Sequence, residues 1–303
     1  MSNRGVQNTG SGSINIGHGA TGDHATVYVG KWPHTDEMAG GADRPRRADV
    51  GVITVLSEET SAVASALQVT GTVNIRVHED GSPCHEAEVS ANVRRFRVVA
   101  TQAADRGPRS AALAFQRLQR YHAPAIVVLV GIAAGVHRSV RLGDVVVTQD
   151  VIYYDQRKET AGGTLRRGET RPVPIRVRHA INRFFSSNGE PYPASFADPD
   201  GVTRTGSVLP GLVASGEAVV ANARSDIRRY IENFNDKTLA LETEAGGVAE
   251  AFHESAGDSG MRGWLSIKGI SDYADEEKND DYHDIASWHA AAVLIEMLPY
   301  LSA

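Results

Sequence analysis

The chain has 303 residues, of which 41% are hydrophobic and 22% charged, a composition that supports a folded core and excludes disorder along the whole length. Its net charge of −6 argues against a general nucleic-acid or anionic-membrane binder. No apolar run reaches the roughly 18–20 residues of a membrane-spanning helix, and the N-terminus lacks the pattern of a secretory signal. The single cysteine, Cys84, excludes an internal disulfide and a multi-cysteine zinc site. From these features together we expect a cytoplasmic protein.

Residues 1–47 differ in composition from the rest of the chain. The stretch 5–22 consists mainly of Gly, Ser, Asn and Thr, and cannot bury enough apolar surface to fold alone. We expect a Gly-rich tail and linker, followed by one domain at 48–303. The alternative is self-association through residues 5–30, because Gly- and Asn-rich segments with alternating apolar residues can stack between chains. This segment loosely resembles the short amyloid-signalling motifs of some immune effectors.

From residue 48 onward, short apolar runs alternate with longer amphipathic segments. Ser57 is predicted to cap the first helix, and Pro108 to begin the second. The alternation predicts an α/β fold with a mixed, largely parallel central sheet flanked by helices. Strands are predicted at 49–56, 72–78, 93–99, 125–130, 144–148, 211–215, 239–241 and 264–267, and helices at 57–67, 108–121, within 171–187, and at 225–234, 243–256 and 285–301.

Carboxylates and a glycine-rich turn follow four of the predicted strands, and Gly269 is expected to permit a tight bend after the last of these strands. Because parallel sheets bind ligands at the carboxyl ends of their strands, we expect these residues to share one site. Asp272 alone could equally cap a turn, and Glu242 and Glu244 alone could be acids at a helix N-terminus. A partly desolvated carboxylate can also share a proton near neutral pH, or accept hydrogen bonds from two ribose hydroxyls. The residues and segments concerned are Glu59, Gly131–Gly135, Glu242, Glu244, Ser271 and Asp272.

Together these segments resemble the nucleoside phosphorylase superfamily, and within it the methylthioadenosine/S-adenosylhomocysteine nucleosidases. The resemblance covers residues 48–303 and implies a nucleoside phosphorylase-like fold. It implies hydrolysis of the N-glycosidic bond of an adenine nucleoside or nucleotide, with no metal or organic cofactor, by a homo-oligomer. The motifs that carry it are Gly131-Ile-Ala-Ala-Gly135, Leu142-Gly-Asp-Val-Val-Val147, Ser215-Gly-Glu217, Glu242-Thr-Glu-Ala245 and Ile270-Ser-Asp-Tyr-Ala-Asp275.

The resemblance also implies a role for each matching residue. Asp272 matches the acid that protonates the purine at N7, and Glu59 matches the carboxylate that positions and deprotonates the attacking water. Glu244 matches the residue that binds the ribose 2′- and 3′-hydroxyls. In glycoside hydrolysis generally, one acid protonates the leaving group while an activated water attacks the sugar from the opposite face, and the implied roles follow this scheme. The further substrate-binding residues implied are Thr243, Glu242, Ala133, Ala134, Gly135, Val219, Val220 and Ser271.

Two features depart from this pattern. Val219 stands where the nucleosidases usually have an aromatic residue that stacks on the base, so Tyr153, Tyr154 or Tyr273 would have to supply one. The segment 157–183 is basic, which is typical of a solvated face or of a site for nucleotide phosphates. Some nucleosidase-like domains of antiphage systems are thought to remove adenine from ATP, which keeps a nucleotide substrate open. The candidate phosphate-binding residues are Arg157, Lys158, Arg166 and Arg167.

Other functions and sites remain as alternatives. A phosphorylase is disfavoured because residues 57–59 contain two carboxylates and no arginine to hold phosphate. A nucleotide-binding sensor that signals through the N-terminal segment is a second alternative. His283 and His289 are expected to be surface or packing residues rather than metal ligands, and no metal site is predicted. Cys84 is expected to be a structural or incidental thiol rather than a nucleophile.

Overall fold

The computed structural model describes residues 47–91, 94–197, 201–255 and 260–301. The predicted tail and the proposed self-association segment at 5–30 lie outside these ranges. Within them, no helix combines the length and the apolar character needed to cross a membrane.

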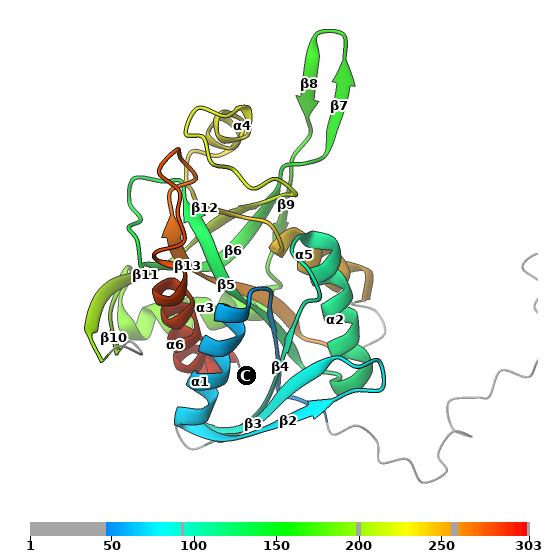
Figure 1. Cartoon of the computed structure of the whole chain (residues 1–303), viewed down its shortest axis with the longest axis vertical. Coiled ribbons are helices and arrows are strands. Elements are labelled where there is room, and N and C mark those ends of the chain that lie inside the picture. The colour runs from blue at the N-terminus through cyan, green and yellow to red at the C-terminus, as the bar shows by residue number, and fades with distance from the viewer. Residues whose placement is uncertain (1–46, 92–93, 198–200, 256–259, 302–303) are drawn as a thin grey trace, which may run out of the picture. The chain divides into compact units, whose positions relative to one another are not determined.

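Eleven of the described strands form one mixed sheet (Figure 1). Its order is β10-β11-β6-β13-β5-β1-β4-β3-β2, while β12 pairs with β11 and β5, and β9 pairs with β6. Two further strands form a separate hairpin, which projects from the sheet at the top of Figure 1. The strands are β1 (Val50–Thr54), β2 (Gly71–Val77), β3 (Pro83–Ala91), β4 (Arg94–Gln102), β5 (Ile126–Gly135), β6 (Val145–Tyr153), β7 (Arg157–Thr160), β8 (Gly163–Arg166), β9 (Glu169–Pro172), β10 (Tyr192–Ala197), β11 (Thr203–Ser215), β12 (Thr238–Glu242) and β13 (Gly263–Asp272).

The centre of the sheet is parallel and deeply buried. β1 lies between β4 and β5, β5 also pairs with β13, and all three pairings are parallel. Antiparallel pairs add β2 and β3 at one edge and β10 at the other. Every residue of β1 and β13 is buried, as expected for apolar runs covered on both faces. The predicted α/β fold with a mixed central sheet flanked by helices is confirmed. Five pairings of this sheet are parallel and six are antiparallel.

Two groups of helices flank the sheet (Figure 1). α1 and α3 pack against α6, and α2 packs against α5. Trp264, Phe115 and Phe184 are among the large side chains that are fully buried in the resulting core. The helices are α1 (Ser57–Thr70), α2 (Pro108–His122), α3 (Ile175–Asn188), α4 (Asp226–Phe234), α5 (Ala245–Ser255) and α6 (His283–Leu301).

Several local features differ from the predictions. Ser57 is the first residue of α1 rather than its cap, and the N–H of Leu56 is instead bound by the side chain of Glu59. The segment 83–91 forms β3, although its mixture of charged and small residues gave no strand pattern. Residues 131–135 were expected to form a turn, but they continue β5 through to Gly135.

Gly269 was expected to allow a bend, but it lies inside β13. A Cβ atom at this position would collide with the backbone carbonyl of Ala286 in α6. Glycine is therefore needed here for the close approach of a helix to the strand.

Candidate active site

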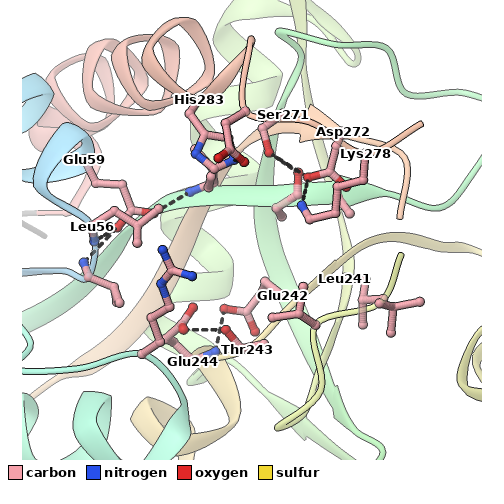
Figure 2. A pocket seen from close by; sticks show the side chains of 18 of the residues that line it. Leu56, Glu59, Leu241, Glu242, Thr243, Glu244, Ser271, Asp272, Lys278 and His283 are labelled. Carbon is pink, nitrogen blue, oxygen red and sulfur yellow. Dashed lines mark hydrogen bonds and ion pairs between the residues drawn. The ribbon is translucent and has the colours of Figure 1, made fainter. Parts of the chain in front are cut away.

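One pocket opens where β1, β5, β12 and β13 end, and three acidic side chains from different elements face it (Figure 2). Glu59 comes from the first turn of α1, Glu244 from the loop between β12 and α5, and Asp272 from the end of β13. All three are less than a tenth exposed. Of the other predicted site residues, Thr243, Glu242, Ala133, Ala134, Val219, Val220 and Ser271 also line the pocket.

Glu59 is held by three backbone donors. Its Oε2 accepts the N–H groups of Val55 at 2.7 Å and Leu56 at 2.9 Å, and its Oε1 accepts the N–H of Ile132 at 2.9 Å. Burial raises the pKa of Glu59 above its ordinary value, and the charge of Lys268 and these three donors offset only part of that effect. The carboxylate is therefore fixed in position and disposed to accept a proton.

Gly131 makes room for this carboxylate. A Cβ atom at residue 131 would collide with the side-chain oxygens of Glu59. The glycine at the start of the predicted glycine-rich segment therefore lets the acid pack directly against β5, rather than providing a turn.

A buried lysine, Lys268, joins two more acids. Its Nζ lies 3.0 Å from Glu242 Oε2 and 3.6 Å from Glu244 Oε2, and its side chain is 1% exposed. Burial alone would lower the pKa of Lys268, but the attraction of Glu242, Glu244 and Glu59 outweighs it, and the pKa is raised. The ammonium therefore stays charged and balances part of the negative charge of the site.

Glu242 and Glu244 differ in what their oxygens contact. Those of Glu242 accept the backbone N–H groups of Glu244 and Ala245 at 3.0 Å as well as the Lys268 ion pair, so this residue caps α5. Glu244 Oε1 accepts the Gly107 N–H at 3.0 Å and the Thr243 hydroxyl. Its Oε2 contacts only Lys268 among the described residues, which leaves lone pairs available for a ligand.

Asp272 is fixed at one oxygen and ion-paired at the other. Oδ1 accepts the backbone N–H of Ala274 at 2.8 Å, while Oδ2 contacts the Ser271 hydroxyl at 3.1 Å and the Nζ of Lys278. Lys278 belongs to the loop between β13 and α6, so this loop reaches back over the site.

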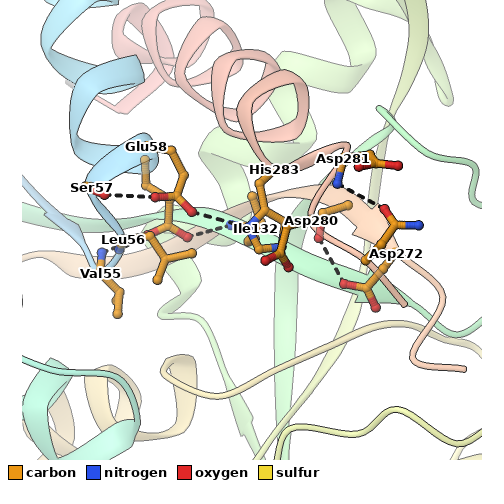
Figure 3. Close-up of polar contacts among 12 residues, drawn as sticks. Val55, Leu56, Ser57, Glu58, Ile132, Asp272, Asp280, Asp281 and His283 are labelled. Atoms are coloured by element: carbon orange, nitrogen blue, oxygen red, sulfur yellow. Dashed lines mark hydrogen bonds and ion pairs between the residues drawn. The ribbon is translucent and has the colours of Figure 1, made fainter. Parts of the chain in front are cut away.

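A second contact ties the same part of the chain to α1. Figure 3 shows His283 beside Glu58, with Nδ1 3.2 Å from Glu58 Oε1, and its Nε2 lies 3.2 Å from Asp280 Oδ1. Both Asp280 and His283 line the pocket. The loop at 275–281 is therefore held on two sides of the pocket, by Lys278 at Asp272 and, through the contact of Asp280 with His283, at Glu58.

Several predicted site residues do not line the pocket. Gly135 lies against the side chains of Val140 and Ile270 instead, and a Cβ atom on residue 135 would come too close to both. Glu217 forms an ion pair with Arg109 outside the pocket. The remaining residues outside it are Arg157, Lys158, Arg166 and Arg167, on or next to the β7–β8 hairpin, and Tyr153, Tyr154 and Tyr273.

Sequence reasoning also missed residues in and next to the pocket. Lys268, which pairs with Glu242 and Glu244 of the pocket lining, could have been found, because a charged residue inside an apolar strand must be paired when it is buried. Arg106, Lys278 and His283 come from loop or helix-end positions, and their sequence context gave no sign that they face the site. His289 packs as expected: it is buried and stacked on Phe196, with ring centroids 3.9 Å apart.

The family model of the phosphorylase superfamily matches residues 49–299. The chain belongs to the phosphorylase superfamily. The solved structures that it resembles are of the same fold, with low sequence identity. A 5′-methylthioadenosine/S-adenosylhomocysteine nucleosidase from Neisseria meningitidis, in complex with methylthio-immucillin-A, has a TM-score of 0.62 and 21% identity, covering 82% of this chain and 97% of its own. The futalosine hydrolase of Helicobacter pylori has a TM-score of 0.63 and 14% identity, covering 84% and 98%.

Two curated relatives extend the comparison. The ATP nucleosidase Cap17 of Escherichia coli (strain KTE188) is 29% identical over 189 residues, which are 58% of this chain and 36% of the relative. This chain therefore spans about a third of that relative's length. A 5′-methylthioadenosine/S-adenosylhomocysteine nucleosidase of Hydrogenovibrio crunogenus is 27% identical over 206 residues, which are 65% of this chain and 78% of the relative.

Proposed function

We propose that this chain hydrolyses the N-glycosidic bond of an adenine nucleoside or nucleotide and releases adenine. The observation that carries the proposal is the convergence of Glu59, Glu244 and Asp272 on one pocket (Figure 2). The reaction passes through a state with positive charge on the ribosyl carbon, and it needs an acid for the leaving base and a base for the water. The names of the curated relatives, both adenine nucleosidases, support the same reaction class.

In the proposed reaction, Glu59 takes a proton from the attacking water. The water oxygen bonds to the ribosyl carbon as the bond from that carbon to the purine breaks. The raised pKa of Glu59 suits this role, because a general base works best when its pKa approaches the working pH. Its three backbone contacts leave further lone pairs on the carboxylate for the water.

Asp272 gives its proton to the departing base. Since Lys278 contacts Oδ2 of Asp272, the lysine has to leave this oxygen, or turn toward the substrate, when the base binds. Ala274 continues to hold Oδ1 and keeps the carboxyl group oriented. Ser271 contacts the same carboxyl group and acts as a positioning residue.

Glu244 binds the ribose hydroxyls through the lone pairs that Gly107 and Thr243 leave free. Lys268 contacts carboxylates rather than substrate, so we assign it a positioning role. A hydroxyl–carboxylate contact that strengthens as positive charge develops on the sugar lowers the barrier.

The cations at the pocket favour a nucleotide over an uncharged nucleoside. Among the described residues, Arg106 and Lys278 are the arginine and lysine side chains that line it. Arg106 is exposed, so its guanidinium is free to meet the 5′ phosphates of a substrate such as ATP. Val219 is 66% exposed and supplies no aromatic face for the base, which departs from a methylthioadenosine pocket.

Adenine release from ATP, adenosine and methylthioadenosine tests the proposal. Each compound is incubated with the purified full chain, with and without inorganic phosphate, and free adenine is measured by chromatography. We expect release that does not depend on phosphate, with ATP the best substrate. Release that requires phosphate, with a sugar 1-phosphate product, would identify a phosphorylase. Binding without any release would favour the sensor alternative.

Matched variants separate the 5′ contact from the chemistry. Arg106→Ala should reduce release from ATP about 10-fold or more while leaving adenosine unaffected, as loss of a charged hydrogen bond would do. Arg109→Ala is the control, because Arg109 is nearby in sequence but pairs with Glu217 outside the pocket. Equal losses for ATP and adenosine in Arg106→Ala would contradict a phosphate contact.

We also propose that the protein is cytoplasmic and forms a homo-oligomer, with residues 5–30 contributing to self-association. Light scattering of the full chain and of a variant without residues 5–30 tests the second point. A monomeric full chain would contradict the homo-oligomer, and an unchanged particle mass after deletion would contradict the role of the segment.

A further inference from the structure

Three side chains that ligate soft metals meet away from the pocket. His78 lies in the turn between β2 and β3, Cys84 lies in β3, and His122 is the last residue of α2. The Nε2 atoms of the two histidines are 2.7 Å apart, and Cys84 Sγ is 3.7 Å from His78 Nε2. One ligand atom from each residue lies within 4.8 Å of the others.

His78 is oriented as a metal ligand usually is. Its Nδ1 lies 3.1 Å from the carbonyl oxygen of Ser82, so Nδ1–H donates there and the Nε2 lone pair points into the cluster. Its ring stacks on Tyr121, with centroids 4.2 Å apart. A histidine that binds a metal commonly donates its other ring N–H to a carbonyl or carboxylate in this way.

We propose that His78, Cys84 and His122 bind one Zn²⁺ ion through Nε2, Sγ and Nε2, with water as the fourth ligand. Tetrahedral zinc with bonds of about 2.0 Å to nitrogen and about 2.3 Å to sulfur separates the nitrogen from the sulfur by about 3.5 Å and the two nitrogens by about 3.3 Å. The sulfur of Cys84 already stands at nearly that separation from His78 Nε2. The two nitrogens have to move apart by about 0.6 Å, which a small rotation of the half-buried His78 provides.

The choice of zinc follows from the donor types. Two imidazoles and one thiolate suit Zn²⁺ or a copper ion, whereas magnesium and calcium prefer oxygen ligands. Burial lowers the pKa of His122 to about 4, so this ring is neutral at neutral pH. Because His78 donates from Nδ1, the 2.7 Å contact is donated by the Nε2–H of His122, and zinc binding requires this proton to move to Nδ1 of His122. Burial, with help from Glu86, raises the pKa of Cys84 to about 11, so zinc has to displace the thiol proton and binds more tightly as the pH rises.

One carboxylate and two guanidinium groups act on Cys84 and His122. Glu86 acts on both Cys84 and His122 and favours a cation, while Arg76 and Arg97 oppose one. Glu86 forms ion pairs with both arginines, at 3.4 and 3.1 Å, which reduces their repulsion of a metal.

The proposed ion would fasten an exposed hairpin to the core. β2 is an edge strand with exposed Ile75 and Val77, so it has little apolar burial of its own. Its hairpin with β3 turns beside the C-terminal end of α2, in the lower part of Figure 1. Joining the hairpin to His122 would add stability without contributing to the pocket.

Zinc binding by the full chain, purified without a polyhistidine tag, tests the proposal. Protein treated with a chelator and then dialysed is titrated with Zn²⁺, and bound metal is measured by plasma mass spectrometry. We expect about one zinc per chain, and a melting temperature that rises on zinc addition. Cobalt in place of zinc should give a thiolate-to-metal charge-transfer band in the near-ultraviolet.

Substitutions assign the ligands. Cys84→Ser and His78→Gln should each lower zinc affinity at least 10-fold and remove the zinc-dependent rise in melting temperature, and Cys84→Ser should also remove the cobalt band. His253→Gln is the control, because His253 is an exposed histidine on α5 outside the cluster. Circular dichroism establishes that the variants are folded. No zinc uptake by the wild type, or equal uptake by Cys84→Ser and the wild type, would overturn the proposal.

Discussion

The pocket region and the His78–Cys84–His122 cluster differ in the charge state of their buried ionisable groups. Next to the pocket, Lys268 stays charged because the carboxylates of Glu242, Glu244 and Glu59 act on it. In the cluster, burial lowers the pKa of His122 and holds its ring neutral. A buried ionisable group is tolerated when an opposite charge pairs with it or when it becomes neutral. Only a group that stays charged can stabilise charge that develops during a reaction.

Helix α2 connects the two regions. The residue before it, Gly107, donates its N–H to Glu244, and its last residue is His122. Its 15 residues, at about 1.5 Å each, separate the two regions by about 22 Å. Substitutions in one region should therefore leave the other unaffected, and the following predictions test this contrast.

The largest expected effect is on the proposed acid. Asp272→Asn keeps the shape of the side chain but removes the proton that the leaving base needs, so the rate of adenine release should fall by about 10² to 10⁴. Zinc uptake should stay at the wild-type level. Near-normal adenine release from the folded variant would remove Asp272 from the mechanism.

The next largest effect concerns the buried ammonium. Lys268→Met leaves Glu242 and Glu244 without their cation, which should cost about 3–5 kcal/mol in the free energy of unfolding, measured with urea. The control is Lys237→Met at an exposed position, with an expected change near zero. A loss in Lys268→Met no larger than in the control would show that the charge network does not stabilise the fold.

The neutral cluster predicts a pH dependence of stability. His122 has a pKa of about 4 in the folded protein and about 6.5 when unfolded, so only the unfolded state gains its proton between these values. The free energy of unfolding of chelator-treated protein should therefore fall as the pH decreases from about 6.5 to about 4. The groups acting on this ring are Glu86, His78, Arg97 and Arg76. His122→Gln should show a shallower slope; a slope equal to that of the wild type would place the titration elsewhere.

The smallest effect is expected at Arg157 and Lys158 on β7 of the β7–β8 hairpin, where both residues are exposed. Arg157 lies 3.0 Å from Glu159 and 3.6 Å from Asp155, with its side chain 49% exposed. Arg157→Ala and Lys158→Ala should each change the free energy of unfolding by less than about 1 kcal/mol and leave adenine release from ATP within about two-fold. A loss of 10-fold or more with ATP would restore the phosphate-binding role predicted for these residues.

The sequence predicted the fold because buried parallel strands appear as continuous apolar runs, such as 125–130 and 264–267. It located the acids because each follows a strand whose carboxyl end faces the pocket. It could not reveal that Gly131 accommodates Glu59, since that contact joins α1 to β5. The Lys278 ion pair depends on a loop path, and the meeting of His78, Cys84 and His122 depends on two elements far apart in sequence.

The central claim is that the acids at separate strand ends act on the same glycosidic bond in one step. Measuring kcat/KM for Asp272→Asn, Glu59→Gln and the double variant tests it most directly. Groups that act together in one transition state give strongly non-additive losses, so the double variant should be little slower than the slower single variant. Losses that multiply in the double variant, or single variants as active as the wild type, would contradict the account.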